Sequence, residues 1–118
     1  MKPIITLTTD FGVDSHYTAI MRGVMLSIAP HVRLVDISHR IPPQDVRQAA
    51  WILDQVAWYY PRGTVHLVVV DPGVGTDRAC VAIEIDGRRF VAPDNGVLSL
   101  VSRRASLDWC VRLENPKY

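Results

Sequence analysis

The segment VVVDPGVGTDR, residues 68–78, joins the end of an apolar run to residue types that can do chemistry. The β-branched residues stop at Asp71, a loop with one proline and two glycines follows, and Arg78 supplies a cation seven residues after the carboxylate. If Arg78 folds back beside Asp71, the carboxylate stays ionised at neutral pH and can orient or partly deprotonate a water molecule. A structural ion pair that pins the loop explains the same spacing, so both interpretations stay open.

Other polar side chains also follow apolar runs. Asp10 ends the run PIITLTT, and Asp94 and Asn95 belong to the turn-rich stretch PDNG. In a doubly wound sheet, ligands bind outside the carboxyl ends of the strands, where the connections diverge to opposite faces. We therefore expect Asp10 and Asp71 to share one rim, with Asp94 and Asn95 close by. The alternative is that each aspartate caps the turn or helix that follows it.

The elements that must position these residues alternate between strand and helix patterns. Strands are predicted at 3–9, 32–38 and 64–70, with helices over 14–29 and 42–60 between them. The third strand is too continuously apolar to have a wet face. Residues 80–92 read as two strands joined by a tight turn at Asp86-Gly87, followed by a short helix over 97–103 and a last strand near 108–113. The pattern predicts an α/β fold, a three-layer sandwich with a mostly parallel sheet.

Composition narrows the class of protein. The chain has 118 residues, 48% of them hydrophobic, which suits a single domain with a real core. Its formal charge of +1 comes from 13 basic and 12 acidic residues spread along the chain, and this gives no basic face for nucleic acid or a membrane. With no signal-like N-terminus, we expect a soluble, cytoplasmic protein. The loop after Asp71 lacks the spacing of the phosphate-binding motifs.

Residue types that bind metals are present, but not at the spacing typical of metal sites. Asp10, Asp71, Asp94, His39 and His66 could each bind a metal, but no pair of histidines has a typical separation, so we predict no metal site. His66 lies inside a predicted strand and is expected to be a satisfied core imidazole. The two cysteines, Cys80 and Cys110, have no zinc or disulfide pattern, and we expect them to be ordinary reduced core residues.

Four segments carry a resemblance to a known family. The chain resembles the adenosine-forming S-adenosyl-L-methionine hydrolases, also called SAM hydroxide adenosyltransferases, which are related to the fluorinases and chlorinases. The matching segments run in order through nearly all of the chain: TLTTDFG, VDISHRIPPQDV, PRGTVHLVVVDPGVGTDR and VAPDNGVLSLV. The resemblance implies that residues 1–118 are the N-terminal α/β domain of such an enzyme, with the family's C-terminal β domain absent.

The resemblance also implies roles for individual residues. Asp10 is expected to hold the ribose hydroxyls of the adenosine moiety, and Asp71 and Arg78 to position and activate water or hydroxide for attack on the ribose 5′ carbon. Phe11, Ser15 and Asn95 are the further substrate-binding residues that the motifs imply. The leaving group is a neutral thioether, so the site must supply an aligned, desolvated nucleophile rather than an acid. S-adenosyl-L-methionine is the substrate, and no cofactor is expected.

Departures from the family pattern define the alternatives. The halogenases replace the aspartate at the position of Asp71 and carry a long insertion before PDNG, whereas this chain keeps Asp71 and a short connection, which favours the hydrolase. The family usually has an acid where this chain has Ser15. Its third catalytic residue, a histidine, is expected beyond Tyr118, and its active sites lie between subunits of a homotrimer. The alternatives are therefore a catalytically incompetent adenosine-binding or assembly fragment, and a SAM-dependent halogenase.

Overall fold

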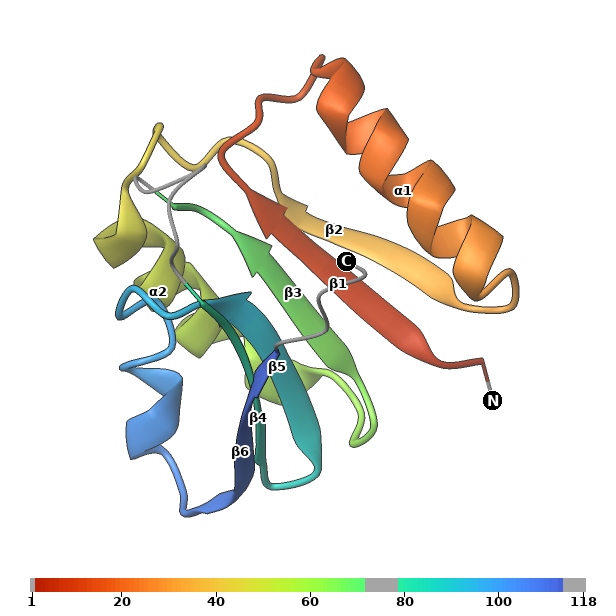
Figure 1. Ribbon diagram of the computed structural model, residues 1–118. Coiled ribbons are helices and arrows are strands. Elements are labelled where there is room, and N and C mark those ends of the chain that lie inside the picture. Colours follow the sequence, from red (N-terminus) through yellow and green to blue (C-terminus); the bar gives the residue numbers. More distant parts are fainter. Residues whose placement is uncertain (1, 72–78, 114–118) are drawn as a thin grey trace.

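The chain folds around one six-stranded sheet (Figure 1). The structure is a computed structural model that describes residues 2–71 and 79–113. The strands lie in the order β2-β1-β3-β5-β4-β6, and β4 runs opposite to the other five. The elements are β1 (Ile4–Thr9), α1 (His16–Ile28), β2 (Arg33–Ser38), α2 (Val46–Val56), β3 (Val65–Val69), β4 (Cys80–Ile85), β5 (Arg88–Pro93) and β6 (Leu107–Leu113), with short 3-10 turns at Ala57–Tyr59 and Val101–Arg103. The predicted α/β fold is confirmed.

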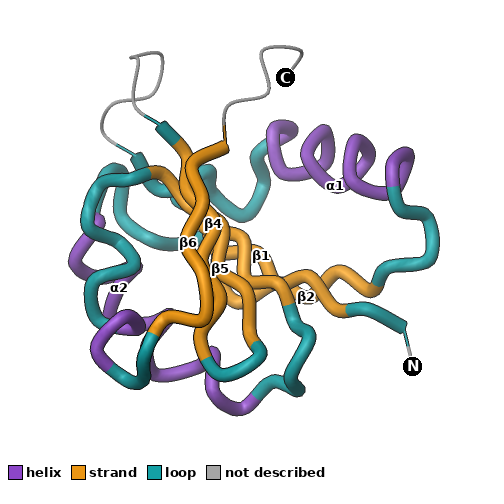
Figure 2. Tube along the Cα trace, turned by 60° about the horizontal axis from the view of Figure 1, so that its bottom comes forward, coloured by secondary structure: helices purple, strands orange, loops and turns teal. Residues whose placement is uncertain are grey.

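The connections reverse direction at β1. The chain passes from β1 through α1 to β2 on one side, and then through α2 to β3 on the other side of β1. Because such crossovers are right-handed, the two helices must lie on opposite faces of the sheet. Figure 2 shows α1 and α2 with the strands between them. The switch point of this sheet therefore lies between β1 and β3, where a ligand is expected at the carboxyl ends.

The helices are shorter than the sequence pattern predicts. The helix expected over 42–60 begins only at Val46, because Gln44 has a φ of 63° and Asp45 caps the first turn by accepting from the Gln48 amide. It ends at Val56 and continues as a 3-10 turn. The short helix expected over 97–103 is reduced to a 3-10 turn at Val101–Arg103. Both predicted helices were too long.

The tight turn between β4 and β5 agrees with its sequence signature. Asp86 and Gly87 both have positive φ, at 48° and 76°. Two successive positive values define the primed turn that matches the twist of an antiparallel pair, and Asp-Gly adopts it readily. This hairpin keeps the connection from Cys80 to Pro93 short.

The core lies on the α2 face of the sheet. Leu53, Val68 and Phe90 are fully buried there, and one apolar cluster joins α2 to β3, β4 and β5. On the other face, α1 buries only Thr18 and leaves Tyr17, Ile20, Val24 and Ile28 more than half exposed. The side chains of β3 are therefore fully buried on one face and half-buried on the other, so this strand is less covered than expected.

The cysteines do not lie in the core. Cys80 and Cys110 are both exposed and free, which corrects the expectation that they are buried. Cys110 belongs to β6, an edge strand with little covering it, and Cys80 begins β4. Within residues 2–71 and 79–113, the helices are too short or too polar to cross a membrane.

Candidate functional site

The switch point brings three predicted site residues to one end of the sheet. In the parallel pairing of β1 with β3, Thr9 lies opposite Val69. Asp10 and Asp71 therefore follow neighbouring strands at the same rim. Asn95 is joined to this rim because its side-chain amide donates to the Val70 carbonyl at 2.8 Å. The predicted rim is thus present, while Arg78 lies outside the described residues.

Asp10 is held by the loop that precedes α2. Its carboxylate oxygen Oδ2 accepts the backbone N–H of Gln44 at 2.8 Å. Among the described residues no hydrogen bond reaches the second carboxylate oxygen, Oδ1. Asp10 is half-buried, and the hydrogen bonds among the described residues leave Oδ1 able to accept one more. The contact with Gln44 depends on that residue's positive φ, which the sequence pattern did not reveal.

The remaining predicted residues have local partners. Ser15 caps α1, with its hydroxyl oxygen accepting the Tyr17 amide at 3.1 Å. Phe11 is half-buried and its ring contacts the Tyr17 ring with centroids 6.3 Å apart. The Asn95 oxygen accepts the Val97 amide at 3.1 Å, which uses the acceptor of its side chain and fixes the turn after β5. Each of these side chains therefore has a structural task at the rim or beside it.

A hydrogen-bonded network that the sequence analysis missed lies directly behind Asp10. Thr9 Oγ1 and His39 Nδ1 are 2.7 Å apart, and both residues are buried. His39 Nε2 is 2.7 Å from Asp36 Oδ1, and Arg22 of α1 pairs with the same oxygen. Thr9 Oγ1 also accepts the Phe11 amide at 3.2 Å. The only signal in the sequence is that polar residues end both β1 and β2. Helix α1 separates these strands along the chain, so the sequence does not show that their ends meet.

The charge of Asp36 is set by this network. Burial alone would raise the pKa of the Asp36 carboxyl, but the hydrogen bonds from His39 and Arg22 outweigh it and hold the pKa below its ordinary value. Asp36 is therefore a carboxylate at neutral pH, which makes it a hydrogen-bond acceptor toward His39.

His66 is a core residue, as predicted, and plays no part in the rim. It is fully buried, with Nδ1 2.6 Å from Thr6 Oγ1 and its ring stacked on Phe90. Burial lowers its pKa to about 4, against the opposing effect of the Ala57 backbone, so the ring is neutral at pH 7. Its Nε2 lacks a hydrogen-bond partner of ordinary geometry among the described residues, so the imidazole is only half satisfied.

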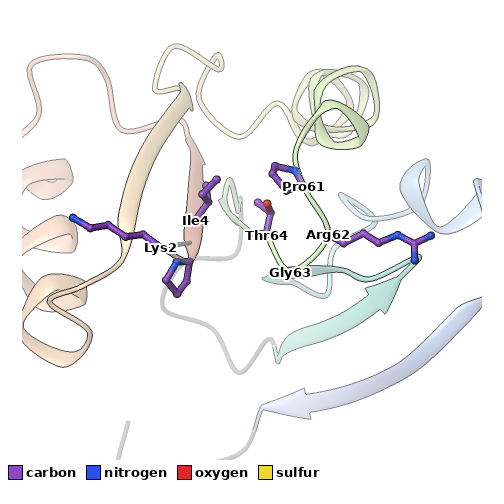
Figure 3. A pocket seen from close by; sticks show the side chains of 7 residues that line it. Lys2, Ile4, Pro61, Arg62, Gly63 and Thr64 are labelled. Atoms are coloured by element: carbon purple, nitrogen blue, oxygen red, sulfur yellow. The ribbon is translucent and has the colours of Figure 1, made fainter.

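Two cavities lie at opposite ends of the sheet, and one of them is at the rim. One of about 450 Å³ lies at the same end of the molecule as Asp10, between the start of α2 and the turn after β5, and its lining includes Trp51, Asn95 and Gly96. Another of about 270 Å³ lies at the opposite, amino end of β1 and β3. Figure 3 shows that the Lys2 and Arg62 side chains point away from this second cavity. It therefore lies at the wrong end of the sheet for the site, and its lining holds no carboxylate.

The described segments contain no group of three histidine, cysteine, aspartate or glutamate side chains that could hold a metal ion. What the rim offers instead is carboxylates, an amide and backbone groups at the carboxyl ends of parallel strands. Such a set suits a polar ligand rich in hydroxyl groups.

Comparison with known sequences identifies the family. A sequence profile described as the SAM hydroxide adenosyltransferase N-terminal domain matches residues 5–118. The chain belongs to this family. It is 40% identical, over 117 residues, to a (R)-S-adenosyl-L-methionine hydrolase of Salinispora arenicola, with 98% of this chain and 44% of the relative covered. A fluorinase of Nocardia brasiliensis is 31% identical over 123 residues, covering 85% of this chain and 41% of that protein.

The fold of the SAM hydroxide adenosyltransferase family is also found among solved structures. A crystal structure of an uncharacterised conserved protein from Thermotoga maritima superimposes with a TM-score of 0.91 at 38% identity, covering 96% of this chain and 44% of that one. The chain thus spans less than half the length of the relatives that it matches. The predicted family is confirmed.

Proposed function

We propose that this chain supplies part of an active site that hydrolyses S-adenosyl-L-methionine to adenosine and L-methionine. The observation that carries the proposal is the placement of Asp10 and Asp71 after neighbouring parallel strands at the switch point of the sheet. The relatives named as S-adenosyl-L-methionine hydrolases supply the identity of the substrate. We further propose a homotrimer, as the resemblance implies, and a cytoplasmic location.

In the proposed reaction, a water oxygen attacks the ribose 5′ carbon as the bond from that carbon to sulfur breaks. The bonding electron pair goes to sulfur, which leaves as the neutral thioether of methionine, and the water gives up one proton. Asp71, with Arg78, orients this water and favours loss of its proton. Asp10 accepts hydrogen bonds from the ribose hydroxyls, and the absence of a hydrogen bond to its Oδ1 within the described residues supports this role. Phe11, Ser15 and Asn95 are the proposed further substrate contacts.

A second candidate is a module that binds adenosine without turnover. The observation that favours it is the Asp10 carboxylate, of which only Oδ2 accepts a hydrogen bond among the described residues, so that Oδ1 can accept one from a ribose hydroxyl. A halogenase is disfavoured by the presence of Asp71 and by the tight β4–β5 hairpin, which leaves no room for an insertion between these strands.

Incubation of the purified chain with S-adenosyl-L-methionine separates these candidates. Adenosine as product, with its formation abolished in Asp71→Ala and unchanged in the control Asp108→Asn, supports the hydrolase; the Asp108 side chain is exposed on β6. No turnover, with adenosine binding that is lost in Asp10→Ala, identifies the binding module. Chloride-dependent formation of a 5′-chloro nucleoside identifies a halogenase. If the chain shows no turnover and does not bind adenosine, the proposed function is contradicted.

A further inference from the structure

In the network behind Asp10, the hydrogens can be assigned so that each one has an acceptor. Asp36 is a carboxylate, so His39 Nε2 must carry a hydrogen and donate to it. In the neutral ring, Nδ1 is then an acceptor, and the Thr9 hydroxyl donates to it. The Thr9 oxygen in turn accepts the Phe11 amide. Hydrogen bonds thus run without interruption from the Phe11 backbone to a carboxylate that Arg22 holds.

The opposite assignment leaves a group unsatisfied. If His39 donated from both nitrogens, the Thr9 oxygen would accept from both His39 and Phe11, and its own hydrogen would have no acceptor in this network. Thr9 is fully buried and His39 is only 8% exposed, so bulk water does not readily replace a missing partner. A buried polar group without a partner is costly, which favours the uninterrupted arrangement.

His39 also holds the same segment through its main chain. Its carbonyl oxygen accepts the Gly12 amide at 2.9 Å. The side chain of His39 therefore acts on Phe11 through Thr9, and its backbone acts on Gly12 directly. Asp10 lies between Thr9 and Phe11, which the hydrogen bond from the Phe11 amide joins, and among the described residues its carboxylate accepts one hydrogen bond, from Gln44. The orientation of its carboxylate consequently depends on the backbone that His39 fixes.

We propose that His39 is a positioning residue that holds the segment from Asp10 to Gly12 in the conformation that binds the ribose hydroxyls. This inference rests on the proposed function. Because a carboxylate that faces two neighbouring hydroxyls must be placed within a fraction of an ångström, a small shift of its backbone weakens binding strongly. His39 does not touch the ligand and acts through Thr9 and Gly12.

Substitutions at His39 separate its two side-chain contacts. In His39→Asn the side-chain oxygen takes the place of Nδ1 and still accepts from Thr9, whereas in His39→Gln the side chain reaches toward Asp36 and the Thr9 hydroxyl loses its acceptor. Thr9→Val removes the same bond from the other side, and Thr9→Ser keeps the hydroxyl. The exposed His31 provides the control His31→Gln.

The first measurement is amide hydrogen exchange of the ligand-free chain. We expect exchange at Phe11 to be about three- to tenfold faster in His39→Gln and Thr9→Val, because the hydroxyl that accepts its N–H is lost or freed to reorient. His39→Asn, Thr9→Ser and His31→Gln should resemble the wild type. Unchanged exchange at Phe11 in both disruptive variants would overturn the inference without bearing on the proposed function.

The second measurement is the Kd for adenosine, taken well below the unfolding midpoint of each variant. We expect about tenfold weaker binding in His39→Gln and in Thr9→Val, and no further loss in the double variant, because both remove one shared interaction. A lower midpoint with unchanged Kd would show a purely structural role and refute positioning. Wild-type chain that fails to bind adenosine refutes the proposed function, and the role of His39 toward ribose fails with it.

Discussion

Acidification from pH 7 to pH 5 should destabilise this domain through one buried side chain. His66 is fully buried beside Thr6 and Phe90, and its pKa in the folded chain is about 4 against an ordinary value of 6.5. Between these two values the unfolded chain binds a proton that the folded chain excludes. The free energy of unfolding therefore has its full value above pH 6.5 and decreases as the pH falls toward 4. Below pH 4, His66 does not lower it further.

The size of this effect follows from the two pKa values. Linkage gives a loss of about 2 kcal/mol between pH 7 and pH 5, and about 3 kcal/mol in total. The carboxyl groups of Asp36 and Asp54 have lowered pKa values, so their titration lies below 3.8 and outside this window. The interval from pH 7 to pH 5 thus excludes the contribution of these two carboxyl groups.

Urea unfolding at the two pH values measures the effect. We expect the loss of unfolding free energy to be about 2 kcal/mol smaller in His66→Gln than in the wild type, and unchanged in the control His31→Gln. The comparison uses differences between pH values, so a general destabilisation of the variant cancels. As a second measurement, the His66 ring protons should titrate with a midpoint near 4 in nuclear magnetic resonance spectra. A midpoint at or above 6, or an equal loss in His66→Gln, would refute the reasoning.

Four further substitutions test the local structure by thermal or urea unfolding. Gly87→Ala should destabilise the domain by about 1–2 kcal/mol, because φ is 76° at this residue. Gly23→Ala in α1, where an added Cβ would meet open space, should instead stabilise it by up to about 1 kcal/mol. Equal effects of the two substitutions would contradict the turn assignment. Asp45→Ala should cost about 1 kcal/mol as loss of the α2 cap, and an unchanged unfolding midpoint would count against it. Arg104→Ala should lower the unfolding midpoint at pH 7, since Arg104 donates to both oxygens of Asp54 at 2.8 and 2.9 Å and lowers its pKa. That stabilisation exists above pH 3.8 and is lost as the pH falls through the lowered pKa, so a difference that persists at lower pH would refute it.

Local signals in the sequence were sufficient for the strands and for the rim. Stretches rich in β-branched and other apolar residues predicted the strands at 3–9, 32–38 and 64–70. Asp10 and Asp71 were expected at one edge because both follow such runs, and parallel strands bring their carboxyl ends together. The turn at Asp86-Gly87 was likewise predictable, because the backbone conformation depends on these two residues alone.

Contacts between distant residues were decided only by the tertiary structure. Thr9 meets His39, Asp10 meets the Gln44 backbone, and His66 meets Thr6 only because β1 pairs with β2 and β3 in one register. That register results from packing the whole sheet against both helices, so no local pattern reveals it. Exposure depends on the same packing, which is why both cysteines were wrongly placed in the core. The sequence alone determined which groups stand at the rim, and the folded sheet decided which groups hold them there.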